Sequence, residues 1–266
     1  MATNYYNDVA NLYDDDYADI YRDANTIAIS QISKTLNQKN PAVLDIATGT
    51  GNALSILKNL YPDATLTAND ISSNMLEISK TKLGNTTHYI NDDLKYIRHH
   101  ISAQSQDLIL CHFAMAFASS QWTIQQSLEL LKPGGLLSIA TTNKSNLSEL
   151  HTKYFRTISR ILGVTKQIHA AHIPNSHRHL VNTLIPHQAQ VLQQHEYKKT
   201  ISYNNVHDLR SYLIDSGWAA TFMSSGYGVK SALIDVIESI YTRCCRLAFP
   251  LHATSDISII LIQKKA

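Results

Sequence analysis

Apolar and polar positions in the middle of the chain alternate between short strand-like runs and longer helix-like stretches. The predicted strands cover residues 42–46, 64–69, 87–91, 107–111 and 135–140. Helical spacing of apolar residues predicts helices between them, at 52–60, 73–83, 94–101 and 121–131. Strands that alternate with helices imply right-handed crossovers and a parallel sheet. We therefore expect an α/β, Rossmann-like doubly wound fold whose ligand lies outside the carboxyl ends of the strands.

The two ends of the chain depart from this alternation. Two helical patterns end at Asn40-Pro41, so we assign an N-terminal helical cap to 1–40 and the core to 41–145. Residues 146–205 begin with a helical pattern and continue as a polar stretch rich in His and Gln, which indicates a lid or substrate insertion. Residues 206–266 are expected to return to the core. There we expect a helix at 206–216, a strand at 218–223, a helix at 230–247 and a final strand at 255–263.

Composition narrows the choice of partners. A chain of 266 residues fits one α/β domain with a cap or insertion, and its formal charge of +2 argues against a strongly basic nucleic-acid surface. The N-terminus lacks the basic start and apolar core of a signal peptide, and the chain has no run of ~18 uninterrupted apolar residues. Three cysteines imply no disulfide framework. We expect a cytoplasmic protein without a membrane partner.

The segment from Asp45 to Gly51 joins the first predicted strand to the next helix and carries the strongest chemical signal. Its glycines allow a sharp turn and a close approach of the backbone to a ligand. The free N–H groups at the start of the following helix would point toward that ligand. Asp45 would repel a pyrophosphate but attract a cofactor that carries an ammonium and a sulfonium. The dinucleotide fingerprint also fails by spacing, because Leu54 stands where Gly or Ala is required.

This segment resembles the first motif of the class I S-adenosylmethionine (SAM) dependent methyltransferases, D/E-x-G-x-G-x-G. Ala47 replaces the first glycine of the motif, and Thr48, Gly49 and Gly51 follow it. The resemblance covers roughly residues 42–142 in the expected order. It implies a mostly parallel seven-stranded sheet that ends with an antiparallel pair, and SAM as the cofactor with S-adenosylhomocysteine as its product.

Asp70 follows the second predicted strand, with Ile71 beside it. The resemblance implies that this acid binds the two ribose hydroxyls of SAM, which requires an ionised group that only accepts hydrogen bonds. The alternative is that Asp70 caps helix 73–83, a role for which Ser72 is at least as suitable. Met75 occupies a position where the family packs an apolar side chain on the adenine; it is otherwise a core residue.

Asp92, Asp93 and Leu94 follow the third predicted strand. In the resembled family an Asp here accepts from the adenine amino group, and the next backbone N–H donates to a ring nitrogen. The pair Asp93-Leu94 matches that arrangement better than Asp92 does. The alternative is that either carboxylate caps helix 94–101.

Cys111, His112 and Phe113 are expected at the carboxyl end of the fourth strand, between cofactor and acceptor. An unperturbed pKa of about 6.5 makes His112 the candidate general base. The alternative is a hydrogen-bonded residue in the wall of the pocket. In the cap, the segment Ala10-Asn-Leu-Tyr13-Asp14 resembles the family element A-x-x-Y-D, whose Tyr covers the methionine end of the cofactor.

Eight of the thirteen histidines lie between His151 and His207, and two pairs, His169-x-x-His172 and His177-x-His179, have spacings that could hold a metal. Because no Cys lies nearby and Glu196 is the one adjacent acid, we predict a solvated lid without a metal site.

We predict a SAM-dependent methyltransferase that acts on an O, N or C atom of a small-molecule acceptor, since the cap and lid would enclose a pocket. Two alternatives stay open: a carrier-bound or protein acceptor, including a malonyl thioester, and a SAM-binding module without turnover. A nicotinamide oxidoreductase is disfavoured by Asp45 and Leu54. The sequence does not indicate the acceptor or the oligomeric state.

Overall fold

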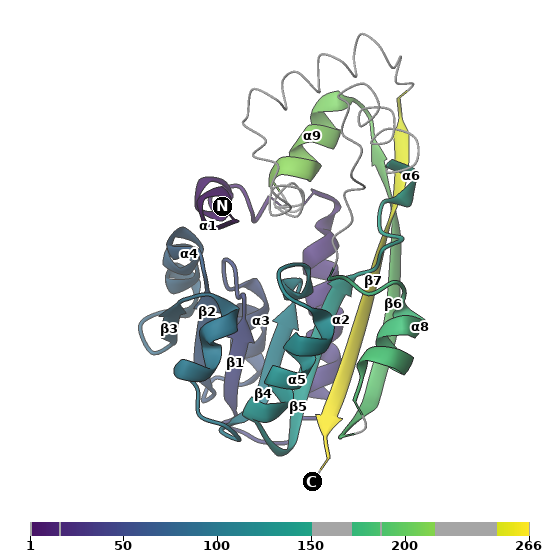
Figure 1. Ribbon diagram of the computed structural model, residues 1–266. Coiled ribbons are helices and arrows are strands. Elements are labelled where there is room, and N and C mark those ends of the chain that lie inside the picture. Colours follow the sequence, from purple (N-terminus) through teal and green to yellow (C-terminus); the bar gives the residue numbers. More distant parts are fainter. Residues whose placement is uncertain (1, 16, 151–171, 187, 216–248, 266) are drawn as a thin grey trace.

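The computed structural model describes residues 2–15, 17–150, 172–186, 188–215 and 249–265, and these contain a seven-stranded sheet (Figure 1). The strand order is β3-β2-β1-β4-β5-β7-β6. β7 is antiparallel to both of its neighbours, and the other paired strands are parallel. This confirms the expected Rossmann-like α/β fold.

The central alternation agrees closely with the pattern of apolar residues. The five parallel strands are β1 (Ala42–Ile46), β2 (Thr65–Asp70), β3 (His88–Asn91), β4 (Gln106–His112) and β5 (Leu131–Thr142). The helices between them are α3 (Asn52–Leu60), α4 (Ser73–Leu83), the 3-10 helix η2 (Leu94–His99) and α5 (Ser120–Leu130). A further 3-10 turn, Ala114–Ala116, follows β4.

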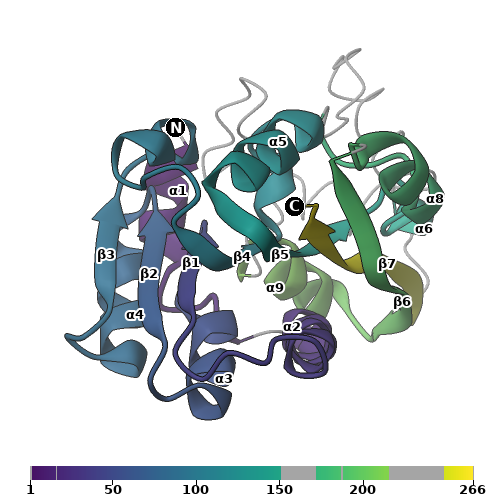
Figure 2. The same ribbon diagram turned by 90° about the horizontal axis from the view of Figure 1, so that it is seen from below.

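Helices cover both faces of the sheet, as Figure 2 shows from below. On one face α2 (Ile20–Ser33), α3 and α4 pack Ile32, Leu54 and Leu83 against the strands. On the other face α5 and η2 contribute Leu128 and Ile97 to a second apolar cluster. Every residue of β4 is buried, as expected for a central parallel strand that is covered on both sides.

The N-terminal cap consists of α1 (Ala2–Val9), the short η1 (Tyr17–Asp19) and α2. Whereas α2 belongs to the helical layer, α1 lies apart from it, beside α4 (Figure 1). The cap therefore has two parts, of which only the second is built into the core.

The strand next to β7 is β6 (Ala189–Tyr203), which corrects our assignment of the whole of 146–205 to a lid. β6 is an edge strand with several exposed or half-exposed side chains, so it carries Gln, His and Lys where a central strand would carry Val and Ile. The polar composition of β6 is the reason that the sequence pattern predicted a lid at these residues. The short helices α6 (Ser148–Leu150), α8 (His177–His179) and the π-helical turn Leu180–Leu184 precede it.

After β6 the chain forms α9 (Val206–Asp215), as predicted, and it returns in β7 (Leu251–Lys264). The strand predicted at 218–223, the helix predicted at 230–247 and most of the helical pattern that begins at 146 lie outside the described residues. Among the residues that are described, no helix has the length and apolarity needed to cross a membrane.

Candidate cofactor site

The turn from β1 to α3 brings the backbone into a left-handed conformation at three positions. Ala47, Gly49 and Gly51 have φ values of 58°, 56° and 80°. A non-glycine residue in this region costs roughly 1 kcal/mol or more, so Ala47 is strained where the family motif has glycine. Gly51 is required for space as well, because a Cβ there would lie 2.5 Å from Ser79 Oγ. The N–H of Thr48 donates to the carbonyl oxygen of Asn69 (2.8 Å) and fixes the turn against β2.

Asp45 lies buried beneath this turn. The Thr48 hydroxyl donates to Asp45 Oδ2 over 2.7 Å. Burial raises the pKa of Asp45 to about 7; the Thr48 bond opposes this shift and the nearby charge of Asp70 adds to it. A cationic group next to Asp45 would offset the cost of burying its charge. The carboxylate is therefore suited to a positively charged ligand.

Asp70 joins the end of β2 to the glycine turn. Its Oδ2 accepts from the N–H of Gly49 (2.8 Å) and its Oδ1 from the N–H of Ser72 (2.9 Å). Burial raises its pKa, against the effect of these backbone hydrogen bonds. The N-cap of α4 is Ser72, whose hydroxyl accepts from Met75 N, so the capping alternative for Asp70 is wrong. Each oxygen of the fixed carboxylate keeps capacity for a further donor.

Asp92 and Asp93 follow β3 and both have partners within the protein. Asp93 is the N-cap of η2 and accepts from Lys95 N (3.0 Å), so it has the capping role that we kept as its alternative. Asp92 Oδ2 lies 2.8 Å from His100 Nε2, and that contact lowers the pKa of Asp92. Leu94 is buried and belongs to the apolar cluster on the α5 face.

Met75 lies beneath the N-terminal segment. It is 1% exposed and packs with Val9 and Ala10, next to Tyr6 and Tyr13. Met75 therefore has the burial of the core residue that we kept as its alternative, and its packing on the adenine stays a prediction. The apolar residues that cover it come from α1 and the residues after it.

A row of contacting aromatic rings lies near the carboxyl ends of β1 and β4. Tyr13 lies over the glycine turn, where a Cβ on Gly49 would be 3.8 Å from Tyr13 Cε1. Its ring stacks on Tyr21 at 6.0 Å, and Tyr21 meets Phe113 edge-on at 4.6 Å. On the other side Tyr6 meets Phe117 at 5.6 Å. The rings place Tyr13 and Phe113 near the glycine turn, and Phe117 was not singled out from the sequence.

His112 does not have the environment of a base. Its Nδ1 lies 2.8 Å from Asn25 Oδ1 and its Nε2 2.9 Å from Ser138 Oγ. Because the Asn25 oxygen can only accept, Nδ1 carries the proton and Nε2 accepts from the Ser138 hydroxyl. Burial lowers the pKa of His112 to about 4. We correct the expectation: His112 is a neutral, hydrogen-bonded residue that joins β4 to α2 and β5.

Cys111 is also buried, and its side chain belongs to the apolar cluster on the α5 face. Burial, together with the charge of Asp45, raises the pKa of its thiol to about 12. The thiol is therefore neutral and chemically inert near neutral pH.

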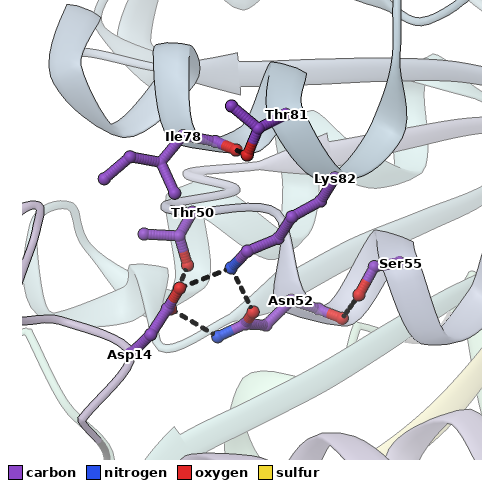
Figure 3. Close-up of polar contacts among 7 residues, drawn as sticks. All are labelled: Asp14, Thr50, Asn52, Ser55, Ile78, Thr81 and Lys82. Atoms are coloured by element: carbon purple, nitrogen blue, oxygen red, sulfur yellow. Dashed lines mark hydrogen bonds and ion pairs between the residues drawn. The ribbon is translucent and has the colours of Figure 1, made fainter.

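A polar cluster around Asp14 was missed by sequence reasoning (Figure 3). Asp14 Oδ1 accepts from Thr50 Oγ1 (2.6 Å) and Asn52 Nδ2 (2.9 Å), and Oδ2 pairs with Lys82 Nζ at 2.6 Å. Lys82 also donates to Asn52 Oδ1 over 2.6 Å. Burial alone would raise the pKa of Asp14, but the hydrogen bonds from Lys82 and Thr50 outweigh it and lower the pKa. We call Asp14, Thr50, Asn52 and Lys82 the Asp14 cluster.

Of the histidines considered for a metal, His169 lies outside the described residues. His177 contacts Gln194 Oε1 at 3.2 Å, and His179 Nδ1 accepts from the N–H of Asn175. Within the described ranges, no three His, Cys, Asp or Glu residues are grouped so as to hold a metal ion.

Comparison with known proteins places this geometry in context. A methyltransferase domain model matches residues 43–135. The malonyl-[acyl-carrier protein] O-methyltransferase of Halalkalibacterium halodurans is 28% identical over 231 residues, which are 84% of this chain and 82% of that protein. The enzyme of the same description from Priestia megaterium is 32% identical over 152 residues, 56% of this chain and 54% of that protein. The chain thus spans about half the length of the latter relative.

Among solved structures, the plantazolicin methyltransferase BamL in complex with a substrate analogue and S-adenosylhomocysteine aligns with a TM-score of 0.55. The alignment covers 97% of this chain and 90% of that one at 18% sequence identity. At this identity the likeness is one of fold.

Proposed function

We propose that the chain is a class I S-adenosylmethionine-dependent methyltransferase that transfers a methyl group from SAM to a carboxylate oxygen of an acceptor. A carboxylate is proposed as the acceptor chiefly because His112 is neutral and both of its ring nitrogens are hydrogen-bonded within the protein. Two further supports are the arrangement of Asp45 and Asp70 around the glycine turn and the names of the relatives.

In this proposal the cofactor lies along the carboxyl ends of β1, β2 and β3. Asp70 accepts hydrogen bonds from the ribose hydroxyls, which its two backbone donors leave room for. Asp45 lies beneath the cationic methionine end, and Gly49 lets that end pass close to the backbone. The adenine lies beside Ile71 and Leu94, and Asp93 Oδ2, which takes no part in the capping bond, accepts from its amino group.

Methyl transfer is an in-line displacement. The acceptor oxygen attacks the methyl carbon while the carbon–sulfur bond breaks, and the electron pair of that bond stays on sulfur as the neutral thioether of S-adenosylhomocysteine. Positive charge on sulfur and negative charge on the carboxylate are both lost, so a site that excludes water accelerates the step. Most of the protein's contribution is alignment of the two groups.

A carboxylate acceptor needs no general base, so the reaction does not require His112 to accept a proton. A hydroxyl or a protonated amine must lose a proton in the reaction, whereas a carboxylate is already ionised near neutral pH and needs no base. The neutral His112, with both nitrogens engaged, is compatible with an acceptor of that kind. The relatives named as malonyl-[acyl-carrier protein] O-methyltransferases favour a malonyl thioester on a carrier, the alternative that we kept beside a small-molecule acceptor.

The cofactor is tested by thermal unfolding with S-adenosylhomocysteine, SAM and NAD. A ligand that binds only the folded chain raises the midpoint in proportion to the logarithm of its concentration. We expect both sulfur cofactors, and not NAD, to raise it.

The acceptor is tested by S-adenosylhomocysteine formation with malonyl-acyl carrier protein. Acetyl-acyl carrier protein is the matched control, since it has the same carrier and thioester without the free carboxylate, and free malonate tests a small-molecule acceptor. Turnover with the malonyl carrier alone supports the proposal. Turnover with free malonate at a similar kcat/KM favours a small-molecule carboxylate, and turnover with neither would leave the cofactor assignment standing and remove the carboxylate.

A further inference from the structure

Residues 2–15, which we call the N-terminal segment, lie over the candidate cofactor site and contact the core through both apolar and polar residues. Tyr13 lies over Gly49, and the segment's apolar residues cover Met75. Two further contacts are polar. Any ligand bound at the glycine turn would thus lie beneath this segment.

The first polar contact is made by Asn7 at the start of α4. The Ser72 hydroxyl donates to Asn7 Oδ1 (2.6 Å), and Asn74 Nδ2 donates to the carbonyl oxygen of Asn7 (3.0 Å). Ser72 is also the residue whose N–H is bound by Asp70. Asn7 therefore holds the segment next to the carboxylate that is proposed to bind the ribose.

The second polar contact is the Asp14 cluster, which reaches two helices. Asp14 contacts Asn52 at the start of α3 and Lys82 in the last turn of α4, positions 38 and 68 residues away in sequence. It also binds Thr50, which lies between the two glycines of the turn. The residue next to Tyr13 is therefore fixed from three directions (Figure 3).

The chain that follows the N-terminal segment is attached to β6. Lys199 Nζ donates to the carbonyl oxygen of Ala18 (2.7 Å) and pairs with Asp23 at 2.9 Å. Ala18 and Asp19 both have positive φ values, 64° and 56°, so the chain changes direction at a conformation that costs energy for these residues. The chain is thus anchored at this bend, and the Asp14 cluster fixes the adjoining end of the N-terminal segment.

We propose that Asp14 is a positioning residue that fastens the N-terminal segment over the glycine turn and thereby sets the rate at which the bound cofactor leaves. Asp14 acts through Tyr13, which it holds above Gly49, and it does not touch the reacting atoms. Release of the cofactor requires the segment to lift, and lifting breaks the ion pair with Lys82 and the hydrogen bonds from Thr50 and Asn52. This inference rests on the proposed cofactor.

The test measures the dissociation rate of S-adenosylhomocysteine by stopped-flow displacement with excess SAM. Asp14→Ala is expected to raise the rate about tenfold or more, because charge-assisted hydrogen bonds are the stronger ones. Asp14→Asn keeps an acceptor for Thr50 and is expected to lie between the parent and Asp14→Ala. Lys82→Met should raise the rate in the parent and should add little in the Asp14→Ala background.

Two matched variants serve as controls. Lys80→Met removes a lysine of the same helix that pairs with Glu77 instead, and Asp15→Asn removes an exposed charge next to Asp14. Both should leave the dissociation rate unchanged. Thermal unfolding without ligand shows whether each variant is folded.

The outcomes separate this inference from the proposed function. If the parent binds S-adenosylhomocysteine and folded Asp14→Ala releases it at the parental rate, Asp14 has no positioning role and the inference is overturned. A Lys80→Met effect as large as that of Lys82→Met would overturn it too, because the effect would then be one of general charge. If the parent binds no S-adenosylhomocysteine, the proposed cofactor fails, and the inference fails with it.

Discussion

His112 Nδ1 donates to Asn25 Oδ1 over 2.8 Å, and this bond joins the carboxyl end of β4 to the middle of α2. Together with the Ser138 hydroxyl on the other nitrogen, it leaves the ring no free acceptor. A strand places successive side chains on opposite faces, and His112 lies on the face that α2 covers. The position of this residue in sequence is that of a site residue, but its side chain is part of the framework.

Replacement of His112 should therefore affect stability more than turnover. We expect His112→Ala to lower the free energy of unfolding by roughly 1–3 kcal/mol or more, since Asn25 and Ser138 lose their buried partner. Chemical denaturation measures this loss. Turnover per folded molecule should stay within about tenfold of the parent, and a drop of roughly a hundredfold or more in a folded His112→Gln variant would restore the role of base.

His112 should also make stability depend on pH. Its pKa is lowered to about 4 in the folded protein, so the unfolded chain binds more protons below the ordinary value of about 6.5. Its contribution is fully present above pH 6.5 and is lost as the pH falls towards 4, by up to roughly 3 kcal/mol. Comparison of the parent with His112→Gln between pH 7 and 5 isolates this effect. Parallel stability curves for the two proteins would contradict it.

Asp45 should couple cofactor binding to proton release. Its pKa of about 7 means that it is partly protonated in the free protein near neutral pH, and a cationic ligand beside it would lower that pKa. The affinity for SAM should therefore increase from pH 6 to pH 8. Calorimetry in two buffers of different ionisation enthalpy measures the protons released. Asp45→Asn is the control and should show no such release from this site.

Asp70→Ala is expected to weaken the binding of S-adenosylhomocysteine by a few kcal/mol, roughly a hundredfold or more, because the ribose hydroxyls lose a buried acceptor. Gly49 and Ser72 also lose the partner of their N–H groups. Isothermal calorimetry measures the affinity, with Asp63→Ala as an exposed control. Unchanged affinity in a folded Asp70→Ala protein would remove Asp70 from the site.

Gly51→Ala should destabilise the fold through its contact with Ser79. Gly51 has φ 80° and ψ 18°, a left-handed conformation that costs an alanine roughly 1–2 kcal/mol. A Cβ there would also lie 2.5 Å from Ser79 Oγ. The loss of unfolding free energy, measured by chemical denaturation, should exceed the conformational cost and should be smaller in a Ser79→Gly background. If Ser79→Gly does not relieve the Gly51→Ala defect, the defect has another origin.

The sequence was sufficient for β1 and β4 because both strands are buried and contain continuous apolar runs, at 42–44 and 108–111. It was insufficient for β6, since an edge strand is not required to be apolar. An edge strand of this kind can be identified only from the strand with which it pairs. The pairing of β6 with β7 joins residues that are far apart in the chain.

Within the candidate site, the acids that follow β1 and β2 were found because a carboxylate at a strand end is visible in the sequence. The hydrogen bonding of the His112 side chain was not visible, because it depends on Asn25 of α2, which is distant in the sequence. The Asp14 cluster was missed for a related reason. Asp14 and Lys82 are 68 positions apart, and neither belongs to a pattern that points to the other.

The antiparallel pair of β6 and β7 continues past the end of β5. Pairing of β5 with β7 stops at Thr142 and Ile257, but β6 and β7 remain paired as far as Tyr203 and Leu251. This extension carries α9 away from the sheet (Figure 1). The length of this extension therefore sets how far beyond the end of β5 helix α9 begins.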